Sequence, residues 1–322
     1  MRVFRSIEEA QAAGVLRGGA VAIGNFDGVH LGHQRLVQVA REAAAGPVAV
    51  LTFEPHPVQV LRPQLAPPLV TPLPRKLELL ADLEVDAAVV QPFDRSYATT
   101  TAAQFVARDL GERLGAAHVV VGYDFTAGRE RARVDALRPL LAARGIALHV
   151  VEPVTADGLV VSSPKVREFL LEGKVAAAAL LLTRPYDLDG AVARGAGRGR
   201  GFGFATANVE TTALLPANGV YVVRARLGGA QDSAGASGAQ PIGGVCNVGV
   251  KPTVEEAGGP VPEVHLLDFD GRDLYGASIR VAFLARLRDE RRFPSVEALR
   301  AQIARDAQAA RARLGEPDTH IG

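Results

Sequence analysis

Apolar residues in the first part of the chain, up to about residue 182, form short continuous runs that alternate with amphipathic segments. Five of these runs have the length of buried strands: Ala20–Ile23, Val48–Phe53, Ala87–Val90, His118–Val121 and Ala147–Val151. The segments between them carry apolar residues at helical spacing: Leu31–Ala45, Leu73–Leu83, Thr101–Leu114 and Asp135–Ala143. Continuous apolar strands separated by helices are typical of a parallel sheet with helices on both faces. We therefore predict a doubly wound α/β domain over residues 1–183.

The pattern changes after Arg184, where short strands follow one another with turns between them. Six runs are predicted strands: Tyr186–Ala193, Ala205–Glu210, Gly219–Leu227, Gly243–Val250, Glu263–Phe269 and Ser278–Leu284. Asp270-Gly271 is a hairpin turn signal, and Gly228–Gly244 is a low-complexity loop. A closed antiparallel β-barrel accommodates that many short strands. We predict such a barrel over residues 184–322, followed by a terminal helix capped by Ser295.

The composition is that of an ordinary soluble globular protein. The chain has 322 residues, 48% hydrophobic and 22% charged, with a formal net charge of +1. It therefore lacks the basic excess that is typical of nucleic-acid-binding proteins. The first residues of the sequence show no apolar stretch of the length expected for a signal peptide, and no run of the about 18 apolar residues that a membrane-spanning helix needs occurs in it. The single cysteine, Cys246, cannot form an internal disulfide, so we expect a cytoplasmic protein. From the charge and the missing apolar run we expect neither nucleic acid nor membrane as a partner. Whether the chain forms a homo-oligomer is left open.

Two histidines stand three residues apart where the first long strand ends and a helix begins, in the segment Gly24–His33. A helix N-terminus offers free N–H groups and a positive dipole end, and both favour phosphate. Residues three apart share a helix face, so His30 and His33 can point at one ligand, and Gly32 lets the backbone approach it. A cap, a surface pair or a zinc pair are alternatives for a bare His-x-x-His.

Three further segments of the first half fall at or near strand ends. Thr52–Pro57 follows the second strand, and Gly122–Gly128 follows the fourth. Val161–Arg167 combines two hydroxyls with an arginine at a predicted helix start, which suits a triphosphate. The alternative for this last segment is an ordinary cap at Ser163, followed by a proline.

The second half begins with a Gly/Arg-rich segment, residues 194–203, in which glycines alternate with arginines. Bare backbone and guanidinium groups suit phosphate, although a flexible basic loop is the alternative. Thr206 and Asn208 follow, two apart on a predicted strand, so that both side chains face the same side. Hydroxyl and amide oxygens are ligands that suit Mg²⁺. Glu263 and the charged segment Leu287–Phe293 come later in the chain.

These motifs, in this order and spacing, resemble the bacterial bifunctional riboflavin kinase/FMN adenylyltransferases (FAD synthetases) over about residues 18–314. The resemblance implies that the second domain phosphorylates riboflavin with MgATP. It implies that the first domain joins FMN to AMP from a second ATP and releases pyrophosphate. ATP and Mg²⁺ are thus expected, with the flavins as substrates and products.

The resemblance also implies site residues. It assigns catalysis to His30, His33, Arg167 and Glu263. It assigns ATP and phosphate binding to Gly24, Phe26, Asp27, Gly32, Ser162, Ser163, Gly197, Arg198, Gly199, Arg200 and Gly201. It assigns flavin binding to Glu54, His56, Asp124, Phe125, Arg288, Glu290 and Phe293, and metal binding to Thr206 and Asn208.

The chain departs from the family's motifs at three positions: Ala127 replaces an aromatic residue, Pro164 a threonine and Ala205 a proline. These departures leave two alternatives open, a chain with one active half and a non-catalytic flavin-binding regulator. A regulator is the less favoured alternative because His30, His33 and Glu263 are all retained.

Overall fold

The computed structural model describes residues 1–193, 205–228, 240–249, 260–269 and 274–315. The chain forms two compact units. The first unit contains Met1–Pro68 and Leu73–Ser162, and the second contains Leu69–Pro72 and Ser163–Gly322. The functional boundary between residues 183 and 184 stays a prediction.

A six-stranded parallel sheet is the centre of the first unit, in the order β1-β4-β3-β2-β5-β8. Its strands are β1 (Arg2–Phe4), β2 (Ala20–Ile23), β3 (Val48–Glu54), β4 (Ala87–Pro92), β5 (His118–Gly122) and β8 (Ala147–Val151). The predicted parallel sheet is therefore confirmed. The edge strand β1 was not predicted, because three residues are too short to show a periodic pattern. The strand order reverses between β2 and β5, which is the position where open α/β sheets bind ligands.

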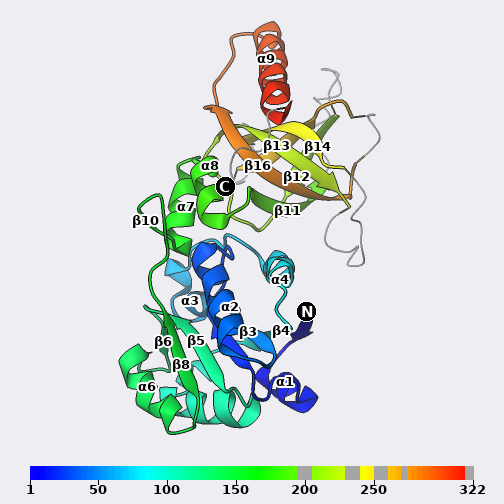
Figure 1. Cartoon of the computed structure of the whole chain (residues 1–322). Coiled ribbons are helices and arrows are strands. Elements are labelled where there is room, and N and C mark those ends of the chain that lie inside the picture. The colour runs from blue at the N-terminus through cyan, green and yellow to red at the C-terminus, as the bar shows by residue number, and fades with distance from the viewer. Residues whose placement is uncertain (194–204, 229–239, 250–259, 270–273, 316–322) are drawn as a thin grey trace. The chain divides into compact units, whose positions relative to one another are not determined.

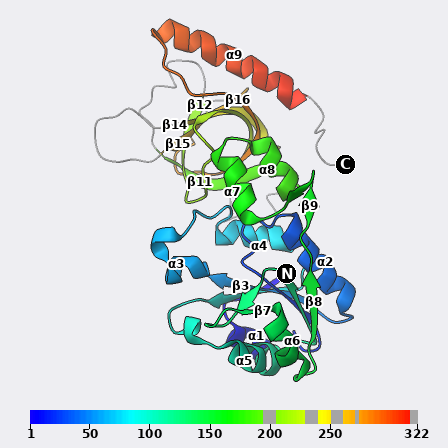
Figure 2. The ribbon, with the colours of Figure 1, turned by 90° about the vertical axis from the view of Figure 1, so that its left-hand side faces the viewer.

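Helices cover both faces of this sheet (Figures 1 and 2). The main ones are α1 (Ile7–Ala13), α2 (Leu31–Ala43), α4 (Leu73–Asp82), α5 (Ala102–Gln104) and α6 (Val134–Ala142). Shorter elements are α3 (Pro57–Leu61), η1 (Pro63–Leu65), η2 (Tyr97–Thr99) and the hairpins β6 (Thr126–Ala127)–β7 (Ala132–Arg133) and β9 (Thr155–Ala156)–β10 (Leu159–Val160). Val21 and Ile23 of β2 pack with α1 and α6, whereas Ala20 and Ala22 pack with α2 and α4.

The predicted helix over Thr101–Leu114 forms, but it is not a regular α-helix along its length. Thr101 caps it through a hydrogen bond from the Gln104 N–H, and α5 then continues as a π-helix, η3 (Phe105–Arg113). Asp109 is fully buried on η3 and accepts hydrogen bonds from Arg108 and from Tyr97. A 3.6-residue period does not distinguish this bonding pattern from an α-helix.

The second unit contains a closed barrel of six antiparallel strands, in the order β11-β12-β15-β14-β13-β16, as predicted. The strands are β11 (Tyr186–Ala193), β12 (Ala205–Glu210), β13 (Gly219–Leu227), β14 (Ile242–Gly249), β15 (Val261–Leu266) and β16 (Ser278–Arg288). Alternate residues fill its interior, where Phe283 packs against Tyr186 and Tyr221. The predicted turn Asp270-Gly271 lies outside the described residues.

Three helices of this unit are described: α7 (Ser163–Leu171), α8 (Val175–Leu182) and α9 (Val296–Gly315). Ser295 caps α9 as predicted, because its Oγ accepts a hydrogen bond from the Ala298 N–H at 3.2 Å. Figure 2 shows α9 lying across the outside of the barrel, where Ala307 and Ala310 pack against strand residues. Helix α7 begins at Ser163, so this serine is its first residue and not the predicted cap.

Candidate functional site

The turn between β2 and α2 has an unusual backbone. Phe26 and Val29 have positive φ angles of 50° and 43°, although neither is glycine. A β-branched residue rarely adopts this conformation, and such strain concentrates at functional sites. Buried packing of both side chains holds the turn, and the Val29 N–H donates to the Phe26 carbonyl. Asp27 is buried between them.

This turn brings the two predicted histidines together at the start of α2. The rings of His30 and His33 stack, with centroids 3.7 Å apart and an interplanar angle of 19°. The Phe26 ring packs against the His33 ring, with centroids 5.0 Å apart. A Cβ at Gly32 would lie 3.2 Å from the His30 ring, so glycine leaves the ring its space. The predicted pair is therefore one compact group at a helix N-terminus.

The His33 side chain is half-buried, and its environment disfavours the charged ring. Burial lowers its pKa well below the usual 6.5, and the nearby His30 and Lys76 lower it further. Its Nδ1 atom is buried without a hydrogen-bond partner among the described residues. His33 is thus neutral at pH 7 before any anion binds.

Lys76 of α4 is a member of the same group that sequence reasoning missed. The side chain is buried, and burial lowers its pKa, whereas Asp27 and Glu54 oppose that shift. Lys76 is one of only four lysines among 36 basic residues, and this scarcity is the signal that could have identified it.

An aromatic cluster lies beside Glu54, where β3 and β4 end. Phe53, Phe93 and Tyr97 have ring centroids 5.8 to 6.2 Å apart. The Tyr97 hydroxyl donates to buried Asp109 at 3.0 Å, which fixes the ring. The Glu54 Oε2 atom is buried without a hydrogen-bond partner in the described residues. This edge of the sheet therefore combines flat apolar surface with an acceptor oxygen.

The other predicted flavin-binding residues of this unit have different environments. His56 caps α3, since its Nδ1 accepts a hydrogen bond from the Val58 N–H at 3.2 Å. Asp124 is exposed on the turn after β5, and Phe125 packs partly against the core. Ala127, which replaces an aromatic residue, is buried in that core.

The predicted triphosphate segment spans the boundary between the compact units. Ser162 ends the first unit, whereas Ser163 and Arg167 lie on α7 in the second unit. Arg167 is buried. The predicted Gly197, Arg198, Gly199, Arg200 and Gly201 lie outside the described residues.

The second unit gathers its predicted residues on the outer face of the barrel. Asn208 of β12 and Asn247 of β14 both face Glu263 of β15 in register. Thr206 pairs with His265 in the same way, and their Oγ1 and Nδ1 atoms are 2.8 Å apart. Asn208 and Asn247, from strands far apart in sequence, thus flank Glu263 on its two sides, and the Thr206–His265 pair is the next same-face pair along β12 and β15. Sequence reasoning missed Asn247, although it lies in a motif that the resemblance covers.

Two groups with shifted pKa values adjoin Glu263. Burial raises the pKa of the Cys246 thiol, and the nearby Glu263 carboxylate raises it further. Burial lowers the pKa of His265, against the opposing effect of Glu263 and Asp306. Both groups are therefore uncharged at pH 7.

The segment after β16 is held by helix α9. Arg288 forms a bidentate ion pair with Asp306, with a shortest distance of 2.7 Å, and Gln302 donates to the same carboxylate. Asp306 and Gln302 are only 6% and 7% exposed, although both are polar. Phe293 lies beneath the Arg288 and Arg291 guanidinium groups, at 5.7 and 5.0 Å.

The Glu290 carboxylate of the same segment lies against Gly249, where a Cβ would come within 2.2 Å of its Oε1. The predicted flavin-binding residues Arg288, Glu290 and Phe293 are thus close to the end of β14. The Arg288 guanidinium is held by Asp306, so a ligand would share this side chain with the carboxylate.

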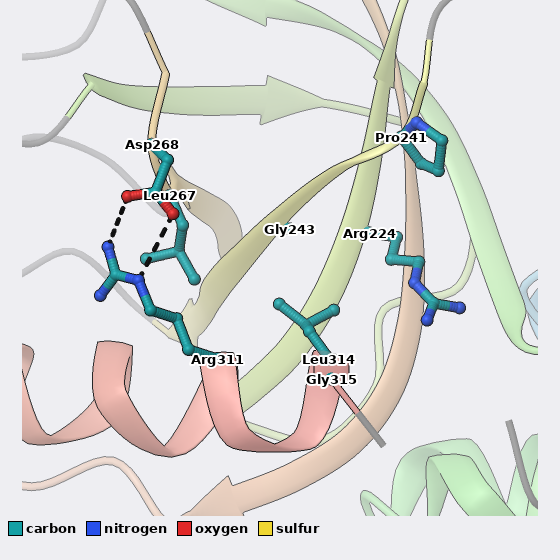
Figure 3. Close-up of a pocket in the computed structure, with 8 residues that line it drawn as sticks. All are labelled: Arg224, Pro241, Gly243, Leu267, Asp268, Arg311, Leu314 and Gly315. Atoms are coloured by element: carbon teal, nitrogen blue, oxygen red, sulfur yellow. Dashed lines mark hydrogen bonds and ion pairs between the residues drawn. The ribbon is translucent and has the colours of Figure 1, made fainter. Parts of the chain in front are cut away.

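A pocket of about 310 Å³ lies between the end of α9 and the barrel (Figure 3). Figure 3 shows Arg311 reaching from α9 to the Asp268 carboxylate, at 2.8 Å, with Leu267 and Leu314 beside it. None of its lining residues is a predicted site residue. The pocket therefore does not mark the predicted chemistry.

Two features are absent from the described ranges of the chain. None of the helices described is long and apolar enough to cross a membrane. In the same part of the chain, no group of three or more His, Cys, Asp or Glu side chains is arranged to hold a metal ion. The predicted metal ligands Thr206 and Asn208 are of other types.

Comparison with known proteins divides the chain as its periodicity does. Residues 13–165 match the family model of FAD synthetase, and residues 182–314 match that of riboflavin kinase. A bifunctional riboflavin kinase/FMN adenylyltransferase from Pseudomonas fluorescens is 38% identical over 94% of this chain and 95% of its own. The protein of that name from Escherichia coli K12 is 37% identical over 98% of both chains.

A crystal structure described as a macrolide-efflux protein from Streptococcus pneumoniae is similar over both units. It has a TM-score of 0.83 and 29% identity, and the match covers 97% of this chain and 99% of that one. Its name refers to another activity, so it supports the fold, whereas the family models and the named relatives support the function.

Proposed function

The chain belongs to the family of bifunctional riboflavin kinase/FMN adenylyltransferases, and from this membership we propose how its residues divide the two reactions. The enzyme phosphorylates riboflavin to FMN and adenylylates FMN to FAD. We assign the adenylyl transfer to residues 1–183 and the phosphorylation to residues 184–322.

The adenylyl transfer uses the stacked histidine pair. An FMN phosphate oxygen attacks the α-phosphorus of ATP, a new P–O bond forms, and pyrophosphate leaves. His30 and His33 stabilise the negative charge that develops on the transferred phosphate and on pyrophosphate. The observation that supports this assignment most is the 3.7 Å stacking of both rings at the start of α2.

The neutral state of His33 is compatible with this role. Burial and the nearby His30 and Lys76 lower its pKa, and the negative charge of a bound triphosphate would act in the opposite direction. A neutral imidazole also offers one N–H donor to a phosphate oxygen. We assign Gly24, Phe26, Asp27 and Gly32 to shaping this phosphate site.

The flavin of this reaction is assigned to the edge where β3 and β4 end. Phe53, Phe93 and Tyr97 offer the flat apolar surface that an isoalloxazine ring needs, and Glu54 offers an acceptor. His56, Asp124 and Phe125 were also predicted to bind flavin and stay proposals. Ser162, Ser163 and Arg167 stay proposals for the triphosphate.

The phosphorylation uses Glu263 as the general base. Its carboxylate takes the proton of the ribityl hydroxyl while that oxygen attacks the γ-phosphorus of ATP, and ADP leaves. The register that sets Glu263 between Asn208 and Asn247 supports this role. Arg288, Glu290 and Phe293 are proposed flavin contacts, and Arg198 and Arg200 proposed phosphate contacts.

Magnesium fits the donor set beside Glu263. Thr206 and Asn208 lie on one face of β12 and offer a hydroxyl and an amide oxygen, which are the hard ligands that Mg²⁺ prefers. The ion would be held by these two residues together with ATP phosphates. When bound, it neutralises charge on the phosphates during transfer.

We also propose that the enzyme works in the cytoplasm on small molecules: riboflavin, FMN and ATP. Its single cysteine, which is buried, supports a reducing compartment. The absence of nucleic-acid and membrane partners, and self-association, stay predictions.

One assay tests the proposal against its alternatives. The purified chain is incubated with riboflavin, ATP and Mg²⁺, and the flavins are separated by chromatography. We expect FAD. Accumulation of FMN alone would mean that only the kinase half works, and unchanged riboflavin would support a non-catalytic flavin-binding regulator. Replacing riboflavin by FMN tests the transferase half by itself.

A further inference from the structure

The Thr206–His265 contact joins two strands beside the proposed metal site. The two residues are paired in register between β12 and β15, and the Thr206 Oγ1 and His265 Nδ1 atoms are 2.8 Å apart. Asn208 and Glu263 form the next same-face pair of the same two strands. His265 thus touches one proposed metal ligand and lies two residues from the proposed base.

The barrel does not need His265 for its core. Val264 and Leu266, its neighbours on β15, are buried in the interior at 0% and 2% exposure. His265 points to the opposite face, because side chains alternate along a strand. The ring therefore belongs to the outer face, where it contacts the Thr206 hydroxyl.

A threonine hydroxyl can serve a cation only if its proton points elsewhere. The oxygen must turn a lone pair to the ion, so the O–H needs an acceptor on another side. The Nδ1 atom of a neutral imidazole is such an acceptor when the ring proton is on Nε2, and it lies within hydrogen-bond distance of Thr206. Partners of this kind fix the orientation of metal ligands in many sites.

We propose that His265 is a positioning residue of the kinase reaction: its Nδ1 accepts the Thr206 hydroxyl proton and turns the oxygen lone pairs toward Mg²⁺. This inference rests on the proposed function, in which Thr206 is a metal ligand. It gives His265 no contact with substrate.

The test replaces the ring with side chains that differ in the position of their polar atoms. Asparagine carries an acceptor at the same number of bonds from the backbone as Nδ1, whereas glutamine carries it one bond further out. We expect His265→Gln to raise the Mg²⁺ KM of FMN formation by about 10- to 100-fold, with kcat near that of the parent at saturating Mg²⁺. His265→Asn should recover most of the affinity.

A binding measurement without turnover accompanies the kinetics. Mn²⁺ binding in the presence of ADP is followed by electron paramagnetic resonance, and we expect the same order: parent, then His265→Asn, then His265→Gln. FMN adenylylation by the same variants should be unchanged, which shows that the first unit is intact, and the retained kcat of FMN formation shows that the barrel is folded. His149→Gln is the matched control, because His149 is a half-buried strand histidine outside both sites. It should leave the Mg²⁺ dependence unchanged.

Thr206→Val separates failure of the inference from failure of the proposed function. If Thr206→Val leaves the Mg²⁺ dependence of FMN formation unchanged, Thr206 is not a ligand and both are wrong. If Thr206→Val raises the Mg²⁺ KM but His265→Gln does not, the inference alone is overturned. In the double variant we expect no loss beyond that of Thr206→Val, because both changes remove one interaction.

Discussion

The two units of this enzyme position their proposed reactive side chains in different ways. In the first unit, His30 and His33 lie in one turn of chain, and the local backbone around Phe26 and Val29 sets their stacking. In the second unit, Thr206, Asn247 and Glu263 come from three strands, and the register of the barrel brings them together. A local turn can be recognised in a contiguous motif, whereas a strand-built site depends on correct pairing of distant segments.

This difference also predicts how each site fails. A change in the first site should act on one reaction through the group that is removed. A change that loosens the barrel can disturb several site residues together, because they share a ladder of strand pairs. The variants below test this difference between the units, in order of decreasing expected effect.

Glu263→Gln should have the largest effect. Glutamine keeps the size and hydrogen bonding of the side chain but cannot accept the proton, so FMN formation should fall by about 10²- to 10⁴-fold. The measurement is the rate of FMN formation from riboflavin and ATP, by chromatography of the flavins.

The control is the same variant supplied with FMN and ATP, which should make FAD at nearly the parent rate. If Glu263→Gln disables both reactions in a folded chain, the assignment of one reaction to each half is wrong.

His33→Ala should disable the other reaction. Loss of one preorganised group at the phosphates typically lowers a rate by about 10²- to 10³-fold, so FAD formation should fall while FMN accumulates. The matched control is His118→Ala, because His118 is a half-buried histidine of the same unit outside the turn. Unchanged FAD formation by both His30→Ala and His33→Ala would remove the transferase site from this turn.

Asp306→Asn should destabilise the barrel unit and not the first unit. Asparagine leaves the Arg288 guanidinium without its carboxylate, in a pair whose side chains are 21% and 8% exposed. A fully buried pair loses about 3–5 kcal/mol when one partner is removed. Because Arg288 is partly exposed, we expect about 2 kcal/mol in the free energy of unfolding.

Hydrogen exchange with peptide resolution measures this effect in each unit separately. Asp268→Asn is the matched control, since Asp268 pairs with Arg311 of the same helix but this ion pair is exposed, at 75% and 48% of the two side chains. It should leave the free energy of unfolding nearly unchanged. Equal effects of the two variants would mean that Asp306 does not anchor α9.

The periodicity of the chain predicted both architectures. Five strands of the first unit and all six of the barrel were located from apolar runs, because buried strands and helices differ in period and length. Bounds were less accurate where the pattern continues without a break, as in β16, which runs on to Arg288. The π-helical hydrogen bonding of η3 could not be predicted, because the spacing of its apolar residues resembles that of an α-helix.

Site prediction followed the same division. The turn at His30 and His33 was predicted because its residues are adjacent in sequence, and they do lie together. Lys76 was missed because only folding brings α4 to the turn, and no motif marks it. The Thr206–His265 contact needs the register between β12 and β15, which a sequence does not state. The ion pair between Arg288 and Asp306 likewise depends on where α9 packs.

The smallest effect concerns pH. Burial, His30 and Lys76 lower the pKa of His33 in the folded chain, whereas the unfolded chain keeps the usual value of 6.5. Below that pH His33 binds a proton in the unfolded state but not in the folded state, so acid favours unfolding of the first unit. The free energy of unfolding should fall by up to about 1.4 kcal/mol for each pH unit below the unfolded pKa.

His33→Gln cannot bind this proton. Hydrogen exchange of first-unit peptides at about pH 7 and about pH 5.5 should therefore show a weaker pH dependence in the variant than in the parent. Peptides of the barrel should show the same dependence in both proteins. A parent and variant with equal slopes in the first unit would contradict the neutral state of His33.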